Sequence, residues 1–139
     1  MPNRTALVDG YGAVIQPNSF AILSSAARTA TTTSSDFTNT AYRGLRVTFN
    51  VSTVASTAPS LVLDIQAKAQ QANTYTSMLL SAAVVGTATN AYTVYPGIGA
   101  AGGANTNTSH GFPHLFRVMV NANTQTAAIT YSVEGDWLL

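Results

Sequence analysis

The sequence predicts an all-β domain, an antiparallel β-sandwich or jelly roll with a barrel as the alternative, and no long helix. Apolar and polar residues alternate in several segments at the period-two spacing of half-buried strands. Clusters of Thr, Ser, Asn, Gly and Pro separate these short segments, as is typical of sandwiches and barrels. No stretch shows sustained apolar spacing of three and four residues with helix caps, so no long helix is expected.

The clearest strand is expected over 43–52, where apolar and polar residues alternate strictly from Leu45 to Val51. One face of this strand is therefore expected to be core and the other solvated. The turn TVASTAP follows, and a second alternating strand is expected over 61–67. We expect these two strands to pair antiparallel.

Four more strands are expected toward the C-terminus. One lies over 75–85, after the polar turn QQANT, and its small-residue tail favours a kink or bulge. A short aromatic strand over 91–95 ends at Pro96, because proline cannot donate to a central ladder. The last two are expected over 115–121 and 127–134, on either side of the turn NANTQT.

The chain length suits a single domain over 1–139, since a chain of this size buries enough surface for one core. We expect 1–42 to form a partly extended N-terminal arm region. Short strands are plausible over 5–8 and 20–23, whereas AARTATTTSSDFTNTA (26–41) is small, polar and low in complexity. Either an extended arm or an ordered loop fits this composition.

The segment 97–113 holds five glycines and little that could form a core. We expect it to be an exposed excursion from the domain, because connections this long are usually functional.

Charge and composition exclude several classes of partner. Only 8% of residues are charged and the net charge is +1, so no long-range field would gather nucleic acid or an anionic membrane. No apolar window approaches the length of a membrane span, and the start MPNRTALVDGYG does not predict a signal peptide. A weakly charged, Thr-rich surface favours association with other subunits.

Titratable groups are too few to predict an enzyme or a small-molecule substrate. There is no G-x-S-x-G motif for a nucleophile, and no cysteine for a thiolate metal site or a disulfide. The available groups are Asp9, Asp36, Asp64, Asp136, Glu134, His110 and His114.

No cofactor or metal ion is expected. His110 and His114 stand four residues apart, but Gly111 and Pro113 break the helix that a zinc-binding pair of this spacing needs. The glycine run GAAGG lacks the G-K-[ST] ending of a phosphate-binding loop.

Five segments taken in order resemble small virion proteins of tailed bacteriophages, with head decoration proteins as the nearest group. They are RGLRVTFNVS, SLVLDIQAK, YTVYPGI, LFRVMV and ITYSVEG. The resemblance covers 43–139 and includes the order YPG, long loop, FRV strand.

The resemblance implies a β-sandwich subunit that binds the outside of a capsid and cements neighbouring capsomers, without enzymatic activity. The implied partners are the major capsid protein and further copies of this chain, with a homotrimer favoured. The implied location is the capsid surface of the virion, after synthesis in the host cytoplasm.

On this hypothesis the contact residues lie mainly in the polar segment 28–40 and in the loop 97–113. Both are long and weakly charged, which suits an extended segment lying on a preformed surface. The aromatic Trp137 would close the core or anchor an oligomer, and we favour core closure because large aromatics are mostly buried. The candidate interface residues are Arg28, Thr32, Asp36, Phe37, Arg43, Ile98, Asn105, Asn107, His110, Phe112, His114 and Trp137.

Two other functions remain open. A phage tail, fibre or baseplate subunit would assemble into rings or tubes. A carbohydrate-binding β-sandwich module would need an exposed aromatic strip, for which the candidates are Tyr92, Tyr95 and Trp137.

Overall fold

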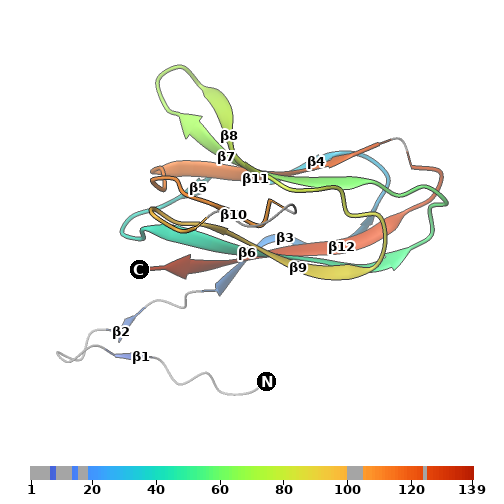
Figure 1. The fold of residues 1–139 in the computed structure, drawn as a ribbon, viewed down its shortest axis with the longest axis horizontal. Helices are drawn as coiled ribbons and strands as arrows, with labels where there is room; N and C mark the ends of the chain where they lie inside the picture. Colours follow the sequence, from blue (N-terminus) through green and yellow to red (C-terminus); the bar gives the residue numbers. More distant parts are fainter. Residues whose placement is uncertain (1–6, 9–13, 16–18, 100–104, 124) are drawn as a thin grey trace.

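The computed structural model describes residues 7–8, 14–15, 19–99, 105–123 and 125–139, and in these ranges it contains strands and no helix. Two sheets lie face to face, as Figure 1 shows, so the predicted β-sandwich is confirmed. Within the same ranges there is no helix long and apolar enough to cross a membrane.

One sheet, named here the β6 sheet, has five strands in the order β10-β9-β6-β12-β3. All its pairs are antiparallel except the pair formed by β10 and β9. Its strands are β3 (Ser19–Arg28), β6 (Gly44–Val54), β9 (Ala88–Val94), β10 (Asn107–Thr108) and β12 (Ile129–Leu138).

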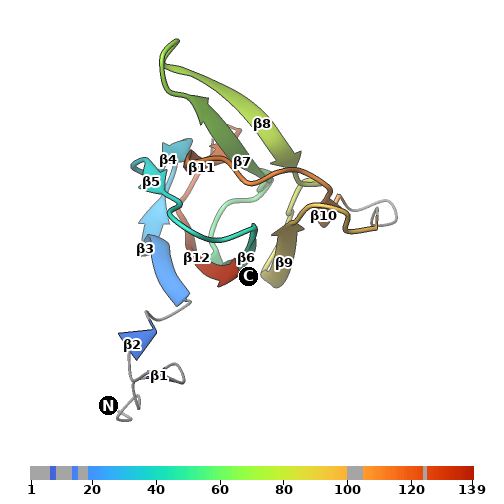
Figure 2. The same cartoon turned by 90° about the vertical axis from the view of Figure 1, so that its left-hand side faces the viewer.

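The other sheet, named here the β7 sheet, has the order β4-β11-β7-β8, and β5 pairs with β11 beside β4. Its pairs are all antiparallel. Its strands are β4 (Thr32–Thr33), β5 (Phe37–Thr38), β7 (Leu61–Ala69), β8 (Thr74–Leu80) and β11 (Leu115–Ala122). The strands β1 (Leu7–Val8) and β2 (Val14–Ile15) pair with each other, away from both sheets (Figures 1 and 2).

The core lies between the sheets and follows the predicted alternation. Over most of the length of the four central strands, every second residue points inward and is almost completely buried. These residues are Leu45, Val47, Phe49, Val51, Leu61, Leu63, Ile65, Phe116, Val118, Val120, Ile129, Tyr131 and Val133.

The expected pairing of the strands at 43–52 and 61–67 is wrong. β6 pairs with β9 and β12, whereas β7 pairs with β8 and β11, so β6 and β7 face each other across the core. An apolar stripe of period two is buried equally well by either arrangement. The connection 55–60 crosses between the sheets, and Ala55 N donates to Ala128 O while Asn123 N donates to Ser60 O.

The strand expected over 75–85 is β8, and it ends earlier. A bulge lies at Met78, opposite Ile65 and Gln66, and therefore before the small-residue tail in which a kink or bulge was expected. After β8 the pairing is resumed by Ser81, whose N donates to Leu63 O, and by a single bridge from Val84 to Leu61. The polar turn before β8 contains Asn73 at φ 52°, a left-handed conformation that asparagine tolerates.

From residue 19 onward, the N-terminal region lies within the sandwich. β3 pairs along β12, and 29–42 then crosses to the β7 sheet, where β4 and β5 pair with β11 (Figure 2). Of the two alternatives for 26–41, the ordered segment is the one observed. Part of the strand expected over 5–8 is β1, and its residues 5 and 6 lie outside the described ranges.

Candidate interaction surface

The outer face of the β6 sheet carries small polar side chains. On its central strand, Arg46, Thr48, Asn50 and Ser52 alternate with the buried core residues and therefore point outward. Most of their partners in the ladder are also polar, so the middle of this face is mainly polar, and Leu138 lies at its end opposite Gly44. The partners are Thr89, Ala91, Thr93, Ser132, Glu134 and Asp136.

The outer face of the β7 sheet combines apolar side chains with a polar network. Arg117 and Met119 of β11 lie opposite Gln66 and Asp64 of β7, and these positions alternate with the buried core residues. On the other side of β7, Leu80 lies opposite Asp64 and is 50% exposed. Large apolar groups therefore lie beside Asp64 on this face, whereas the outward Leu138 of the β6 sheet lies at the end of β12, opposite Gly44.

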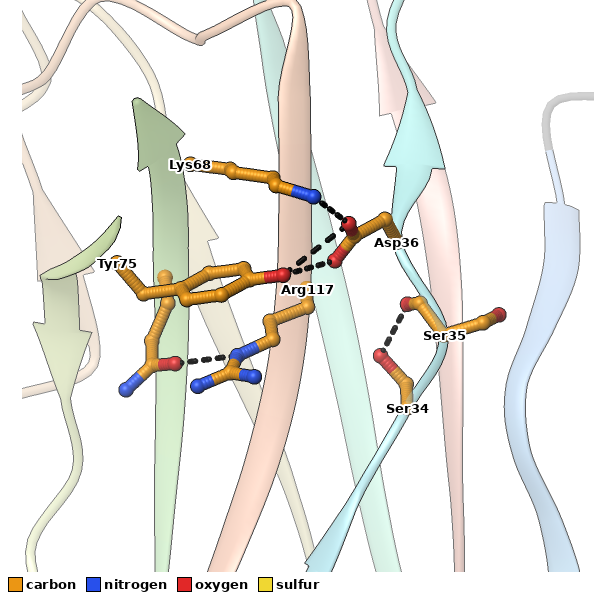
Figure 3. A network of polar contacts seen from close by, with 7 residues as sticks. Ser34, Ser35, Asp36, Lys68, Tyr75 and Arg117 are labelled. Atoms are coloured by element: carbon orange, nitrogen blue, oxygen red, sulfur yellow. Dashed lines mark hydrogen bonds and ion pairs between the residues drawn. The ribbon is translucent and has the colours of Figure 1, made fainter. Parts of the chain in front are cut away.

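Asp36, Lys68 and Tyr75 form one end of the polar network (Figure 3). Lys68 Nζ donates to Asp36 Oδ2 at 2.5 Å, and Tyr75 Oη donates to Asp36 Oδ1 at 2.9 Å. The hydrogen bond from Lys68, and next that from Tyr75, lowers the pKa of Asp36 below its usual value. The same bond to Asp36 raises the pKa of Lys68. The two charges thus neutralise each other locally.

Arg117 is held from two directions (Figure 3). Its Nε donates to Gln66 Oε1 at 2.7 Å, and its guanidinium carbon lies 3.4 Å from the centroid of the Tyr75 ring. Gln66 is itself fixed, because its Nε2 donates to Asp64 Oδ2 at 2.7 Å. A continuous chain of contacts thus links Asp64 in the middle of the face to Lys68 near its end.

Asp64 is unusual for an outward-facing residue because only 4% of it is exposed. Its ladder neighbours Met119 and Leu80 flank it on both sides. Its Oδ1 has no hydrogen-bond partner among the described residues. The side chains of this face therefore form a packed layer and not a loosely solvated one.

An aromatic cluster closes one end of the sandwich around Trp137. The Trp137 ring stacks on Phe20 at 5.1 Å and on Tyr42 at 5.0 Å, and it meets Phe112 and Phe116 edge to face. Trp137 is packed against the hydrophobic core, which is the arrangement that we favoured for it.

The three aromatic candidates for a sugar platform do not form one exposed strip. Tyr92 is 3% exposed and belongs to the core. Tyr95 donates its hydroxyl to Leu139 O at 2.8 Å and lies under Arg43, and Trp137 is stacked between Phe20 and Tyr42.

The structure brings some of the predicted contact residues together at the aromatic end. Phe37 stacks on Phe116, Phe112 meets Trp137, and His114 Nδ1 lies 3.0 Å from Asn39 O in the segment beside them. Arg43 lies near this end with its guanidinium carbon 5.5 Å from the Tyr95 ring.

The other candidates are dispersed. Thr32 pairs with Val120 at the edge of the β7 sheet, and Asn107 lies in β10, so the long loop is partly tied to the β6 sheet. Ile98, Asn105 and His110 lie on that loop, of which 100–104 are outside the described ranges. A contact role for each candidate stays a prediction.

Arg28 lies at the end of the edge strand β3 and is used within the chain. Its guanidinium donates to Ser24 O at 2.7 Å, Tyr131 O at 2.8 Å and Ala26 O at 3.2 Å. The ladder between β3 and β12 is irregular in two places next to these residues. Bulges and a charged side chain both protect an edge strand from pairing with other chains.

Arg117, Tyr75, Lys68 and Gln66 were not among the sequence-based candidates. The outward positions of β7 could have been read from the alternation in LVLDIQAK. Their partners on β8 and β11 depend on long-range pairing, which the local pattern does not contain.

Other features carry less chemistry. Within the described ranges no three His, Asp or Glu side chains gather as they would around a metal ion. An open groove of about 430 Å³ runs along 82–88 and is also lined by Asn90, Tyr92 and Thr106. Burial raises the pKa of Tyr92.

No family model and no curated protein matches this chain. Among solved structures, the chain is similar to the SPBc2 prophage-derived protein YomS, with 18% sequence identity and a TM-score of 0.47. The match covers 90% of this chain and 96% of YomS. Similarity at this level does not establish a shared function.

Proposed function

We propose that this chain is a structural subunit of a tailed-phage virion that decorates the head. It binds the major capsid protein on the outer surface of the shell and cements neighbouring capsomers, as a homo-oligomer for which a trimer is favoured. The five segments that resemble decoration proteins overlap β6, β7, β9, β11 and β12, which supports a likeness across both sheets. On this proposal the chain needs no cofactor and is not an enzyme.

The observation that carries the proposal is the difference between the two outer faces. Arg, Tyr and Met are enriched at the centres of protein interfaces, and the β7 sheet presents Arg117, Tyr75 and Met119 on one face together with Leu80. The β6 sheet presents mainly polar residues suited to water, with the apolar Leu138 at the end of β12. A subunit that lies flat on a shell needs one face of each kind.

The low charge of the chain supports the same function. Six basic and five acidic side chains leave most of the polar surface to neutral groups. Such a surface is desolvated at lower cost than a charged one when it is covered by a partner.

Cosedimentation with preformed shells that lack the protein tests this function. We expect saturable binding at a fixed ratio, together with increased resistance of the shells to heat. Unassembled coat protein is the control, because a cement subunit recognises neighbouring capsomers in a closed lattice. Light scattering of the free protein gives its oligomeric state.

Failure to bind shells would reject the decoration function. Rings or tubes of the purified protein would then favour the tail, fibre or baseplate alternative. Saturable binding in a glycan screen would favour the sugar-binding module.

A further inference from the structure

We infer that Arg117 is a pre-positioned receptor for a carboxylate of the partner protein, at the centre of the docking face on the β7 sheet. This inference rests on the proposed function for the idea that a protein shell covers the face. It adds which face docks and which chemical group on the partner is recognised.

The first argument is the rigidity of Arg117. The Gln66 carbonyl accepts from Nε at 2.7 Å, and the Tyr75 ring covers the guanidinium plane at 3.4 Å. Holding an arginine from its Nε and from one face removes most of its rotational freedom before a partner arrives. A fixed side chain loses less entropy on binding, which raises affinity.

The second argument is the unused part of the guanidinium. Nη1 and Nη2 of Arg117 make no hydrogen bond to any residue in the described ranges, although the side chain is half-buried. These two groups form the planar fork that matches both oxygens of a carboxylate. Lys68 is less suited to such a ligand, because its ammonium already donates to Asp36 and has no planar fork.

The third argument is the surroundings of the fork. Met119 follows Arg117 on the same face of β11. Leu80, which is 50% exposed, lies across β7 from Met119, because both are paired with Asp64. Apolar neighbours that a partner would cover exclude water from a charged hydrogen bond and strengthen it. The site therefore suits a carboxylate set among apolar side chains, as on a protein surface.

A phosphate backbone fits the face less well. Binding to nucleic acid gains affinity from several cations at once, whereas this network holds two basic residues, Lys68 and Arg117, beside two acidic ones, Asp36 and Asp64, and has no excess of basic groups. The ligand that matches one fork is one carboxylate.

The variant Arg117→Lys tests the inference, because it keeps the charge and removes the fork. The matched control is Arg46→Lys, since Arg46 is exposed on the outer face of the opposite sheet. Affinity for shells is measured by cosedimentation, and thermal unfolding shows that each variant is folded. We expect Arg117→Lys to bind about tenfold more weakly or worse, and Arg46→Lys to bind as the wild type does.

An acetate titration followed by ¹⁵N NMR of the arginine side chains gives a readout that does not need shells. We expect the Arg117 Nε signal to shift and saturate at lower acetate concentration than that of Arg46. Equal shell binding by Arg117→Lys and the wild type would overturn the inference and leave the decoration function standing. If the wild type binds no shells, the decoration function fails, and equal acetate responses of the two arginines would overturn the receptor as well.

Discussion

The guanidinium carbon of Arg117 lies 3.4 Å from the centroid of the Tyr75 ring, and this contact joins β11 to β8 across the intervening strand β7. The two residues are far apart in the sequence and share the outer face of one sheet. Tyr75 also donates to Asp36 beside β5, so a single side chain connects the edge strand β8 with the segment at the opposite edge.

Replacing Tyr75 separates the stacking contact from the hydrogen bond. We expect Tyr75→Ala to lower the free energy of unfolding by roughly 1 kcal/mol, because the cation–π contact with Arg117 is lost. Tyr75→Phe keeps the ring and is expected to retain most of that stability. Urea unfolding of both variants checks this, and equal losses would show that the ring contact contributes little.

Two buried serines each accept a hydrogen bond from a backbone N–H of the β7 sheet. Ser34 Oγ accepts from Val118 N at 3.0 Å, and Ser81 Oγ accepts from Leu63 N at 2.9 Å. Replacement of either serine by alanine leaves a buried N–H without its acceptor, which costs about 1–3 kcal/mol. Chemical denaturation should show this loss for Ser34→Ala and Ser81→Ala.

The control for the serine variants is Ser35→Ala, since Ser35 is exposed and adjacent to Ser34. Its unfolding midpoint should match that of the wild type. A loss as large as that of Ser34→Ala would mean that the buried hydrogen bonds are not the cause.

Gly44 begins β6 at a place where no side chain fits. A Cβ there would lie 2.5 Å from Val94 O and 2.5 Å from Tyr95 Cδ2. Because one of these atoms belongs to the backbone, Gly44→Ala should destabilise the domain by about 1–3 kcal/mol. A Cβ at Gly86 meets nothing within 4 Å, so Gly86→Ala should be neutral or slightly stabilising. Thermal unfolding of both variants checks this contrast, and an equal loss of stability in the two would contradict it.

The hydrogen bonds from Lys68 and Tyr75 predict a small acid sensitivity. They hold the pKa of Asp36 below the ordinary value of an aspartate side chain, so ionised Asp36 favours the folded state. This contribution is present above the unfolded pKa and disappears as the pH falls through the lower folded value. It is small because the pair lies at the surface, where solvent screens the two partly exposed charges.

Unfolding midpoints measured from about pH 6 down to about pH 2.5 test the role of Asp36. The difference between wild type and Asp36→Asn should shrink toward zero at the acid end of this range. A difference that stays constant with pH would assign the effect of the variant to packing and not to charge.

The alternation from Leu45 to Val51 predicted a strand, its buried face and the sandwich class, because burial of one face is a local property of the sequence. The pairing of β6 with β12 could not be read in the same way. Residues 45 and 137 meet across the ladder although most of the chain separates them. The expected pairing of 43–52 with 61–67 was wrong because strand pairing depends on such distant segments of the chain.

The candidate contact residues show the same limit. Trp137 was recognised from its residue type, and the structure places it in the aromatic cluster. Arg117 looked like an ordinary outward residue of a strand, and its importance depends on Gln66 and Tyr75, which two other strands supply. Neighbours across strands are set by the register, and the register is not visible in a single segment.

The most direct test of the proposed function is electron cryo-microscopy of shells saturated with this protein. We predict density on the outer surface of the head in which the β7 sheet faces the coat protein, with Arg117 near a coat-protein carboxylate and the β6 sheet facing solvent. Shells without added density, or with the β6 sheet against the coat protein, would contradict the account.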